Sequence, residues 1–258
     1  MNFITSELKN KVLIITLNRP DKFNSFNREM AFELHDALDN AEKNETVRAI
    51  VLTGTGKAFC AGQDLAEAID PNGPGIAKIV DEHYNPIILR LRNIEKPIIA
   101  AVNGVAAGAG ANIALACDIV TATHSASFIQ AFSKIGLIPD SGGTFFLPRL
   151  IGFQKASALM MLGDKVSATE AQHMGMIYKV LPDETFMEDV LKLAETLSGM
   201  PTKAIGFTKR LLNQSMSNDL SAQLLHEGNL QVEASNLYDY KEGVNAFLEK
   251  RKPDFKGL

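Results

Sequence analysis

This chain has few cysteines, no tryptophan and no large excess of positive or negative charge. The 258 residues include two cysteines, Cys60 and Cys117, and no tryptophan. Two cysteines exclude a disulfide-rich scaffold and a zinc site with four cysteine ligands. The 26 basic and 30 acidic residues give a net charge of −4, which argues against a nucleic-acid-binding face over the whole protein.

A targeting segment is missing too, and the one long uncharged run is a poor membrane span. The first ten residues, MNFITSELKN, have no basic stretch followed by an apolar one, so we expect no secretion signal and a cytoplasmic protein. Residues 97–117 carry no charge, but they begin with proline, contain two asparagines and are rich in alanine and glycine. This composition favours a buried strand, a glycine turn and a buried helix over a transmembrane helix.

What is present is a pattern of alternating strands and helices, followed by helices alone. Apolar alternation and β-branched residues predict strands at 3–9, 11–18, 48–54, 97–103, 118–123 and 125–130. Helical periodicity predicts helices at 27–43, with Asn27 as N-cap, at 76–94 and at 111–117. Residues 55–64 are predicted to form a loop. The alternation indicates an α/β core with parallel strand pairing.

The helices continue to the end of the chain. Ser167 and Glu170 have the spacing of a capping box, and from about residue 184 every strong period is helical. The length corresponds to between one and two domains of about 150 residues each. We therefore divide the chain into an α/β core (1–195) and a helical region (196–258), with the MPTK segment at 200–203 as the joint.

Three glycine-containing loops follow predicted strands and are candidates for a binding site: FCAGQD (59–64), NGVAAGAG (103–110) and GLIPDSGGT (136–144). Glycine lets a backbone approach a ligand closely, and two such loops could aim two N–H groups at one carbonyl oxygen. The same glycines could also serve only turns and helix packing. The patterns GxGxxG, GxxxxGK[ST], HExxH and GxSxG are absent.

Among the titratable residues, Asp140 is the best candidate for chemistry. It lies in IGLIPDSGG, between an apolar segment and two glycines. Such an aspartate could cap the following helix, or it could be a carboxyl in an apolar pocket whose pKa is raised by desolvation. The histidines have no metal-ligand spacing, so we predict surface or boundary positions and no metal site for His35, His83, His124, His173 and His226.

Six segments together resemble the crotonase (enoyl-CoA hydratase/isomerase) superfamily, in that family's order. They are TLNRPDKFNSFN (16–27), GKAFCAGQDL (56–65), KPIIAAVNGVAAGAGANIALACDI (96–119), FSKIGLIPDSGGTFFLPRLIG (132–152), SATEAQHMGMIYKV (167–180) and YKEGVNAFLEKRKPDF (240–255). The resemblance implies a crotonase-like spiral of ββα units and a C-terminal helical trimerisation region. It also implies homotrimers, or hexamers built as dimers of trimers, and an acyl-CoA thioester as substrate.

By motif position, the resemblance places the two N–H groups that hold the thioester carbonyl at Gln63 and Ala109. The family's hydratases carry two glutamates, and this chain has Asn112 and Phe132 at those positions, both still expected to contact substrate. One acid remains, Asp140, where isomerase branches keep theirs. A single carboxylate that removes a proton and returns it elsewhere suits isomerisation.

Within the family, the segments FCAGQDL, HYNP (83–86), NGVAAGAGA and AFSKIGLIPDSGGTFFLPR resemble most closely the branch that isomerises a ring-epoxide CoA ester to an oxepin in phenylacetate catabolism. The alternatives are a Δ3,Δ2-enoyl-CoA isomerase or an enoyl-CoA hydratase of fatty-acid oxidation, and, from another class, a non-catalytic acyl-CoA-binding protein. The dehalogenase branch is disfavoured, because it has a tryptophan where this chain has Phe132.

The resemblance also implies how coenzyme A is held. Lys22 would lie near its phosphates, and Lys250 would reach the nucleotide bound to a neighbouring subunit. The adenine would contact the backbone around Ala61, Gln63, Asp64 and Leu65. An apolar or aromatic wall for the acyl group would come from Phe132, Leu137, Phe145 and Phe146, and for at least two of them core packing is the alternative. Coenzyme A enters only as part of the substrate, with no permanently bound cofactor expected.

Overall fold

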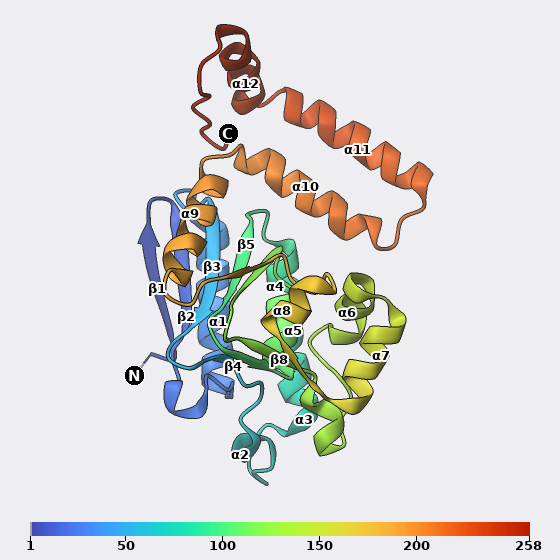
Figure 1. Ribbon diagram of the computed structural model, residues 1–258. Helices are drawn as coiled ribbons and strands as arrows, with labels where there is room; N and C mark the ends of the chain where they lie inside the picture. Colours follow the sequence, from blue (N-terminus) through green and yellow to red (C-terminus); the bar gives the residue numbers. More distant parts are fainter. Residues whose placement is uncertain (1) are drawn as a thin grey trace.

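The computed structural model describes residues 2–258 as two sheets surrounded by helices (Figure 1). The larger sheet has the order β1-β2-β3-β5-β7-β10 and the smaller one β4-β6-β8-β9. In chain order the strands are β1 (Ile4–Lys9), β2 (Val12–Leu17), β3 (Ala49–Gly54), β4 (Ala58–Cys60), β5 (Ile98–Val102), β6 (Val105–Ala107), β7 (Ile119–Thr123), β8 (Ser127–Ile129), β9 (Lys165–Ser167) and β10 (Lys179–Leu181). All six predicted strands are confirmed.

The chain repeats one unit three times: a strand in the larger sheet, a strand in the smaller sheet, then helix. The pairs are β3 with β4, β5 with β6, and β7 with β8. The helices among them are η1 (Pro20–Lys22), α1 (Arg28–Lys43), α2 (Leu65–Ala68), α3 (Gly75–Lys78), η2 (Ile79–Tyr84), α4 (Asn85–Asn93), α5 (Ala109–Leu115), η3 (Ala131–Ile135), α6 (Gly143–Ile151), α7 (Phe153–Leu162) and α8 (Ala168–His173). This spiral of ββα units confirms the predicted fold class.

The larger sheet is buried on both faces, because β2, β3, β5, β7 and β10 pair in parallel and helices cover both sides. Val51 and its same-face neighbours pack against Val190 of α9 (Phe186–Ser198). Ile50 and Leu52, whose side chains point the other way, belong to the core that contains Leu34 of α1. Asn27 caps α1 as predicted, accepting the Met30 N–H at 3.0 Å.

Several short strands of the smaller sheet, and β10 of the larger, escape sequence prediction. β4 lies in the predicted loop at 55–64, and β6 lies in the segment read as a glycine turn. β4, β6, β9 and β10 have three residues each, too few to show an alternating pattern. Long-range pairing, for example of β6 with β8, stabilises them instead.

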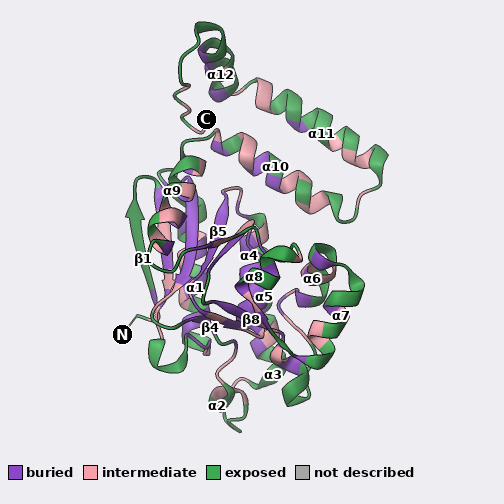
Figure 2. Cartoon of the chain, in the orientation of Figure 1, coloured by how far each residue is buried: buried purple, intermediate pink, exposed green. Residues whose placement is uncertain are grey.

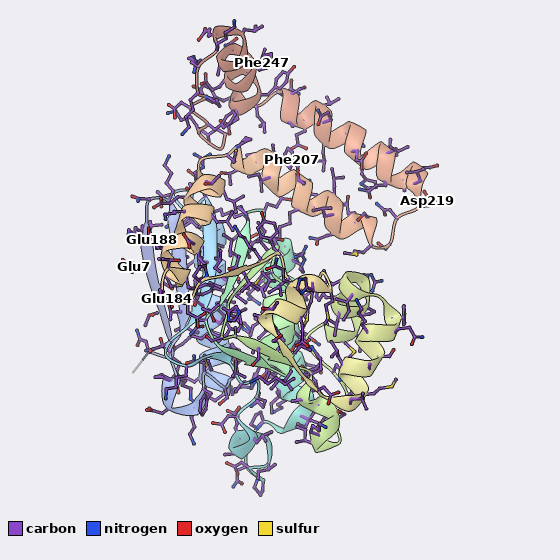
Figure 3. All side chains as sticks on the ribbon, viewed as in Figure 1. Glu7, Glu184, Glu188, Phe207, Asp219 and Phe247 are labelled. Carbon is purple, nitrogen blue, oxygen red and sulfur yellow. The ribbon has the colours of Figure 1, made fainter. Side chains whose placement is uncertain are left out.

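Three helices extend away from the sheets: α10 (Thr202–Ser215), α11 (Leu220–Ser235) and α12 (Tyr238–Glu249) (Figure 1). Figure 2 shows that α11 and α12 are mostly exposed, whereas α10 is mostly intermediate or buried. In Figure 3 Asp219 marks the turn between α10 and α11. The predicted boundary at 195/196 falls inside α9, whereas the MPTK segment spans the break between α9 and α10. Across residues 2–258, no helix is both long and apolar enough to cross a membrane.

Two of the five histidines contradict the expectation of surface or boundary positions. His35 is 6% exposed and His83 is fully buried. The Nε2 atom of His35 lies 2.9 Å from the carbonyl oxygen of His83, and both rings pack edge-on against Phe32. Burial lowers the pKa of both imidazoles. An imidazole that remains neutral can pack in a core, which the sequence pattern does not reveal.

Candidate active site

The loop after β4 leaves the backbone N–H of Gln63 free. The Phe26 N–H donates to the Gly62 carbonyl at 2.7 Å, and the Asp64 N–H donates to the Phe26 carbonyl at 2.8 Å. In this parallel bridge Gln63 stands opposite Phe26, so its own N–H points to the other side. Gly62 makes the turn at a φ of +90°, where glycine is favoured.

A second free N–H, that of Ala109, lies beside the first loop. The Gly108 N–H donates to Ile129 at 2.9 Å, after which Gly108, at a φ of +53°, turns the chain into α5. A β-carbon built on Gly62 would lie 3.5 Å from the Ala109 nitrogen, so the two loops touch. Over the described chain, neither the Gln63 nor the Ala109 N–H donates to a protein acceptor. Two such donors can stabilise one oxyanion.

Asn112, one helical turn after Ala109 in α5, links this helix to Asp140. The Asn112 side-chain amide donates to the Asp140 carbonyl oxygen at 2.9 Å. Burial raises the pKa of the Asp140 carboxyl, and a 2.8 Å hydrogen bond from the Ser141 hydroxyl offsets part of this rise. The N-cap of α6 is Gly142, which has no side chain, so Asp140 does not cap that helix. The structure therefore favours a half-buried carboxyl with a raised pKa over a helix cap.

Asn112 and Phe132 stand at the two positions where the resemblance implies glutamates in hydratases. Asn112 is fully buried, and its amide is engaged by Asp140 and by Gln130. Phe132 is 6% exposed, and a β-carbon on Gly108 would lie 3.8 Å from its ring. The site thus has the Asp140 carboxyl, an amide at position 112 and an aromatic ring at position 132.

Most of the residues predicted to hold coenzyme A lie together. The Ala61 N–H donates to the Phe23 carbonyl at 3.0 Å, which places the loop at 61–65 beside η1 and the exposed Lys22. Asp64 caps α2 and forms an ion pair with Arg19 at 2.7 Å, so its carboxylate is already engaged. Leu65 is 52% exposed. Lys250 lies apart, exposed at the end of α12.

The four predicted apolar residues differ in burial. Phe132 is buried and Phe146 packs partly against the core, whereas Leu137 and Phe145 are exposed. The rings of Phe145 and Phe146 meet edge-to-face with centroids 5.2 Å apart. Core packing therefore accounts for two of the four positions, and exposed apolar surface remains at the other two.

Tyr84 is a site residue that sequence reasoning missed. Its hydroxyl donates to Gln63 Oε1 at 2.9 Å, and the Gln63 amide donates to Glu67 Oε2 at 2.8 Å. Tyr84 is fully buried at the end of η2, a π-helix, a form often found at functional sites. Burial first, and then the charges of Cys60 and Asp140, raise its pKa well above the usual range. Tyr84 therefore remains a hydrogen-bond donor and holds the Gln63 side chain.

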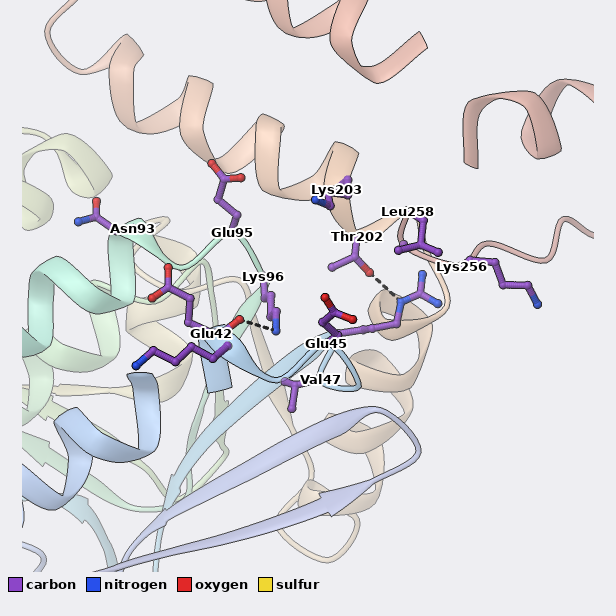
Figure 4. A pocket seen from close by; sticks show the side chains of 13 residues that line it. Glu42, Glu45, Val47, Asn93, Glu95, Lys96, Thr202, Lys203, Lys256 and Leu258 are labelled. Carbon is purple, nitrogen blue, oxygen red and sulfur yellow. Dashed lines mark hydrogen bonds between the residues drawn. The ribbon is translucent and has the colours of Figure 1, made fainter. Parts of the chain in front are cut away.

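A separate hollow of about 530 Å³ contains none of the predicted site residues (Figure 4). Two of its basic groups are already engaged: Lys96 donates to the Ala41 carbonyl at 2.7 Å, and Arg48 donates to Thr202 at 2.8 Å. Within residues 2–258, no three histidine, cysteine or acidic side chains gather as metal ligands.

The fold and the site are those of an α/β enzyme that has two free backbone N–H groups and a partly buried Asp140 carboxyl with a raised pKa. Residues 7–258 match the enoyl-CoA hydratase/isomerase family, and the chain belongs to it. It is 47% identical to the 1,2-epoxyphenylacetyl-CoA isomerase of Escherichia coli, over 100% of this chain and 99% of that protein.

Two further relatives show how wide the family is. The 2,3-dehydroadipyl-CoA hydratase of E. coli is 36% identical, with 96% of each chain covered. The solved enoyl-CoA hydratase of Bacillus anthracis superposes with a TM-score of 0.93 at 33% identity, covering 99% of this chain and 100% of that one. These relatives include both isomerases and hydratases, so identity alone does not fix the reaction.

Proposed function

We propose that this protein is an acyl-CoA isomerase that moves a proton through an enolate. Asp140 takes a proton from C2 of the thioester, and the Gln63 and Ala109 N–H groups bind the enolate oxygen that results. The carboxyl then returns the proton, so the product has the composition of the substrate and no water is consumed. One oxyanion donor contributes about 3–4 kcal/mol to such a step. The observation that carries this proposal is the partly buried Asp140 carboxyl, linked through Asn112 to the helix that begins with the free Ala109 N–H.

The substrate that we propose is 2-(1,2-epoxy-1,2-dihydrophenyl)acetyl-CoA, with an oxepin-CoA ester as product. Loss of the C2 proton would give the enolate, and opening of the epoxide would follow. The 47% identity to the E. coli 1,2-epoxyphenylacetyl-CoA isomerase supports this choice. The aromatic ring of Phe132 beside Gly108 offers an apolar contact for the substrate ring.

The test is to assay wild-type protein and Asp140→Asn with the epoxide thioester and with cis-3-hexenoyl-CoA. Asp140→Asn should abolish turnover and leave CoA-ester binding intact, because only the proton acceptor is lost. Asp164→Asn, at an exposed aspartate outside the site, is the matched control. Turnover of Asp140→Asn at the wild-type rate would overturn the proton-transfer role. Faster turnover of the 3-enoyl ester would instead favour an enoyl-CoA isomerase.

Coenzyme A recognition and assembly belong to the same proposal. Lys22, beside the loop at 61–65, would bind phosphate of the CoA moiety, and Lys250 would do so from a neighbouring subunit. This arrangement needs a homotrimer, or a hexamer of two trimers. The exposed apolar side chains on α10–α12 support an assembly through these helices. No metal or permanently bound cofactor takes part in the proposed step, and a cytoplasmic location stays a prediction.

A further inference from the structure

We propose that the side chains of Asn112 and Gln130 form an amide relay that positions Asp140 for proton transfer. The inference rests on the proposed function of Asp140 and assigns Asn112 a task in it. Asn112 is a positioning residue here, because it acts through Asp140.

The hydrogen bonds of the relay have only one consistent direction. The Asp140 carbonyl oxygen can only accept, so the Asn112 atom that lies 2.9 Å from it must be the nitrogen. Asn112 Oδ1 is then an acceptor, and Gln130 must offer it Nε2, at 2.8 Å. Asn112 and Gln130 are 0% and 2% exposed, so no solvent competes for these bonds. A buried and fully directed pair of amides fixes the Asp140 backbone relative to α5.

Gly143 provides the space for this amide. A β-carbon at position 143 would lie 2.8 Å from Asn112 Cγ and 2.9 Å from Oδ1, so the Asn112 side chain fills the place of any side chain there. The Gly143 N–H also donates to the Asp140 carbonyl at 2.9 Å. Two donors, from α5 and from the start of α6, therefore hold one carbonyl.

Because the Asp140 backbone is held in place, the direction of its carboxyl depends on the Asp140 rotamer and on the hydrogen bond from Ser141. Oδ1 accepts the Ser141 hydroxyl, and no further residue within 2–258 donates a hydrogen bond to this carboxyl besides Asp140 itself. Ser141 has a φ of +52°, a conformation that a non-glycine residue adopts only when its surroundings enforce it. The relay on the residue before it supplies that enforcement, which keeps the carboxyl in one place.

A carboxylate at position 112 cannot do this work. A carboxylate has no proton to donate to the Asp140 carbonyl. It would also place a second negative charge next to residue 140, whose own carboxyl must be ionised for the reaction. An amide of the same shape donates and carries no charge. The relay therefore explains why this chain combines an acid at Asp140 with an amide at Asn112.

The decisive variant is Asn112→Asp, which keeps the side-chain shape but removes the donor. We expect kcat to fall by roughly 10–100-fold with KM unchanged, since a displaced base slows the chemical step and not binding. The acidic limb of the pH–rate profile should also move to higher pH, because two adjacent carboxyls do not both ionise easily. Tyr84 is the other titratable group that the charge of Asp140 reaches, and its own raised pKa keeps it neutral over this range.

Asn236→Asp is the matched control. It makes the same change and also removes a hydrogen bond from a side-chain amide to a carbonyl, here that of Val232 at 3.0 Å. The site, at the end of α11, is exposed. We expect wild-type kcat and an unshifted pH profile for this control.

Gln130→Met tests the relay without touching Asn112 or adding charge. Gln130 Oε1 has no partner in residues 2–258, so this change removes only the bond to Asn112. The variant should lower kcat less than Asn112→Asp, without the pH shift, and it keeps the test open if Asn112→Asp does not fold. Wild-type kcat in a folded Asn112→Asp or Gln130→Met variant overturns the relay.

Failure of the relay and failure of the proposed function give different results. If wild-type protein turns over a CoA ester and Asp140→Asn does not, the function stands, and unaltered kcat in the relay variants refutes only the relay. If wild-type protein turns over neither thioester, the function is refuted. The relay is then tested by NMR titration of the Asp140 carboxyl, whose pKa should be higher in Asn112→Asp than in wild type.

Discussion

At the scale of single residues, Asp140 combines burial with a role that needs a negative charge. Desolvation raises its pKa, so the folded protein binds a proton there more tightly than the unfolded chain does. The stability linked to this group is therefore present below the ordinary aspartate pKa of about 3.9 and is lost as pH rises through the raised value. The ionised carboxyl that the reaction requires thus destabilises the fold at neutral pH.

Asp140→Asn should consequently raise the thermal unfolding midpoint at pH 7 while it abolishes turnover. The neutral amide avoids the desolvation of a charge at every pH, so the gain over wild type should shrink as pH falls toward the ordinary pKa. Differential scanning calorimetry of both proteins at pH 7 and at the lowest pH where both fold measures this. A stability difference that is the same at both pH values would show that ionisation of Asp140 does not contribute.

A second residue-scale prediction concerns Gly110, where the two loops with free N–H groups meet. A β-carbon at Gly110 would lie 2.7 Å from Cys60 Cβ and Sγ, too close for any real contact. Gly110→Ala should push α5 away from β4, separate the Ala109 and Gln63 N–H groups and lower kcat by roughly 10–100-fold. Gly228→Ala in α11, where a β-carbon meets nothing within 4 Å, is the control in steady-state kinetics. Equal kcat for both variants would contradict the assignment of these N–H groups.

The site could be predicted only in part. Asp140 and the glycine loops stand out because an acid between apolar residues and repeated glycines are local signals. Gln130 and Tyr84 give no such signal: each acts through one hydrogen bond to a residue distant in sequence, Asn112 and Gln63 respectively. The buried His35 and His83 were misjudged for the same reason, since their burial depends on Phe32 and on the packing of α1 against η2.

At the scale of elements, a buried ion pair is one of the contacts that join α10 to the core, beside the more exposed pair of Arg210 with Glu95. Lys209 of α10 is 5% exposed, and its ammonium lies 2.8 Å from Asp118, which precedes β7. Asp118 also accepts from Arg92 of α4 and from the Ile98 N–H that begins β5. The sequence predicted that helices follow the core, because their periodicity is local. It could not show this attachment, which links residues 91 positions apart.

Lys209→Met should loosen α10 from the core more than it unfolds the core itself. Removing one partner of a buried ion pair leaves the other charge poorly compensated, which typically costs about 3–5 kcal/mol, although Arg92 will retain part of the compensation here. We expect proteinase K, which does not depend on lysine or arginine, to cut first between α9 and α10, near residues 199–201, and we expect a lower unfolding midpoint. Lys203→Met, at the exposed start of α10, is the control. Unchanged proteolysis of Lys209→Met would contradict a role for this pair in holding α10.

At the scale of the whole molecule, the core sheet is covered by helices, and α11 and α12 leave most of their apolar side chains uncovered. The larger sheet is covered on both faces, whereas α11 buries only Leu230 among its sixteen residues. Apolar side chains on α11 and α12 lie exposed instead: Leu220, Leu224, Leu225, Val232, Val244, Phe247 and Leu248. Apolar surface on this scale usually marks an interface. The proposed assembly through α10–α12 would cover it.

Phe247 offers the sharpest test of that assembly, because it is 83% exposed and lies on α12 at the end of the molecule far from the sheets (Figure 3). We expect the wild-type protein to sediment as a trimer or a hexamer, and Phe247→Glu to dissociate, since burying a carboxylate in an apolar interface is strongly unfavourable. The KM for CoA esters should rise together with dissociation if Lys250 binds the nucleotide of a neighbouring subunit. Leu8→Glu, at an exposed position of β1, is the control in analytical ultracentrifugation. A monomeric wild-type protein would refute the assembly. A Phe247→Glu variant that dissociates but keeps the wild-type KM would refute the role of Lys250.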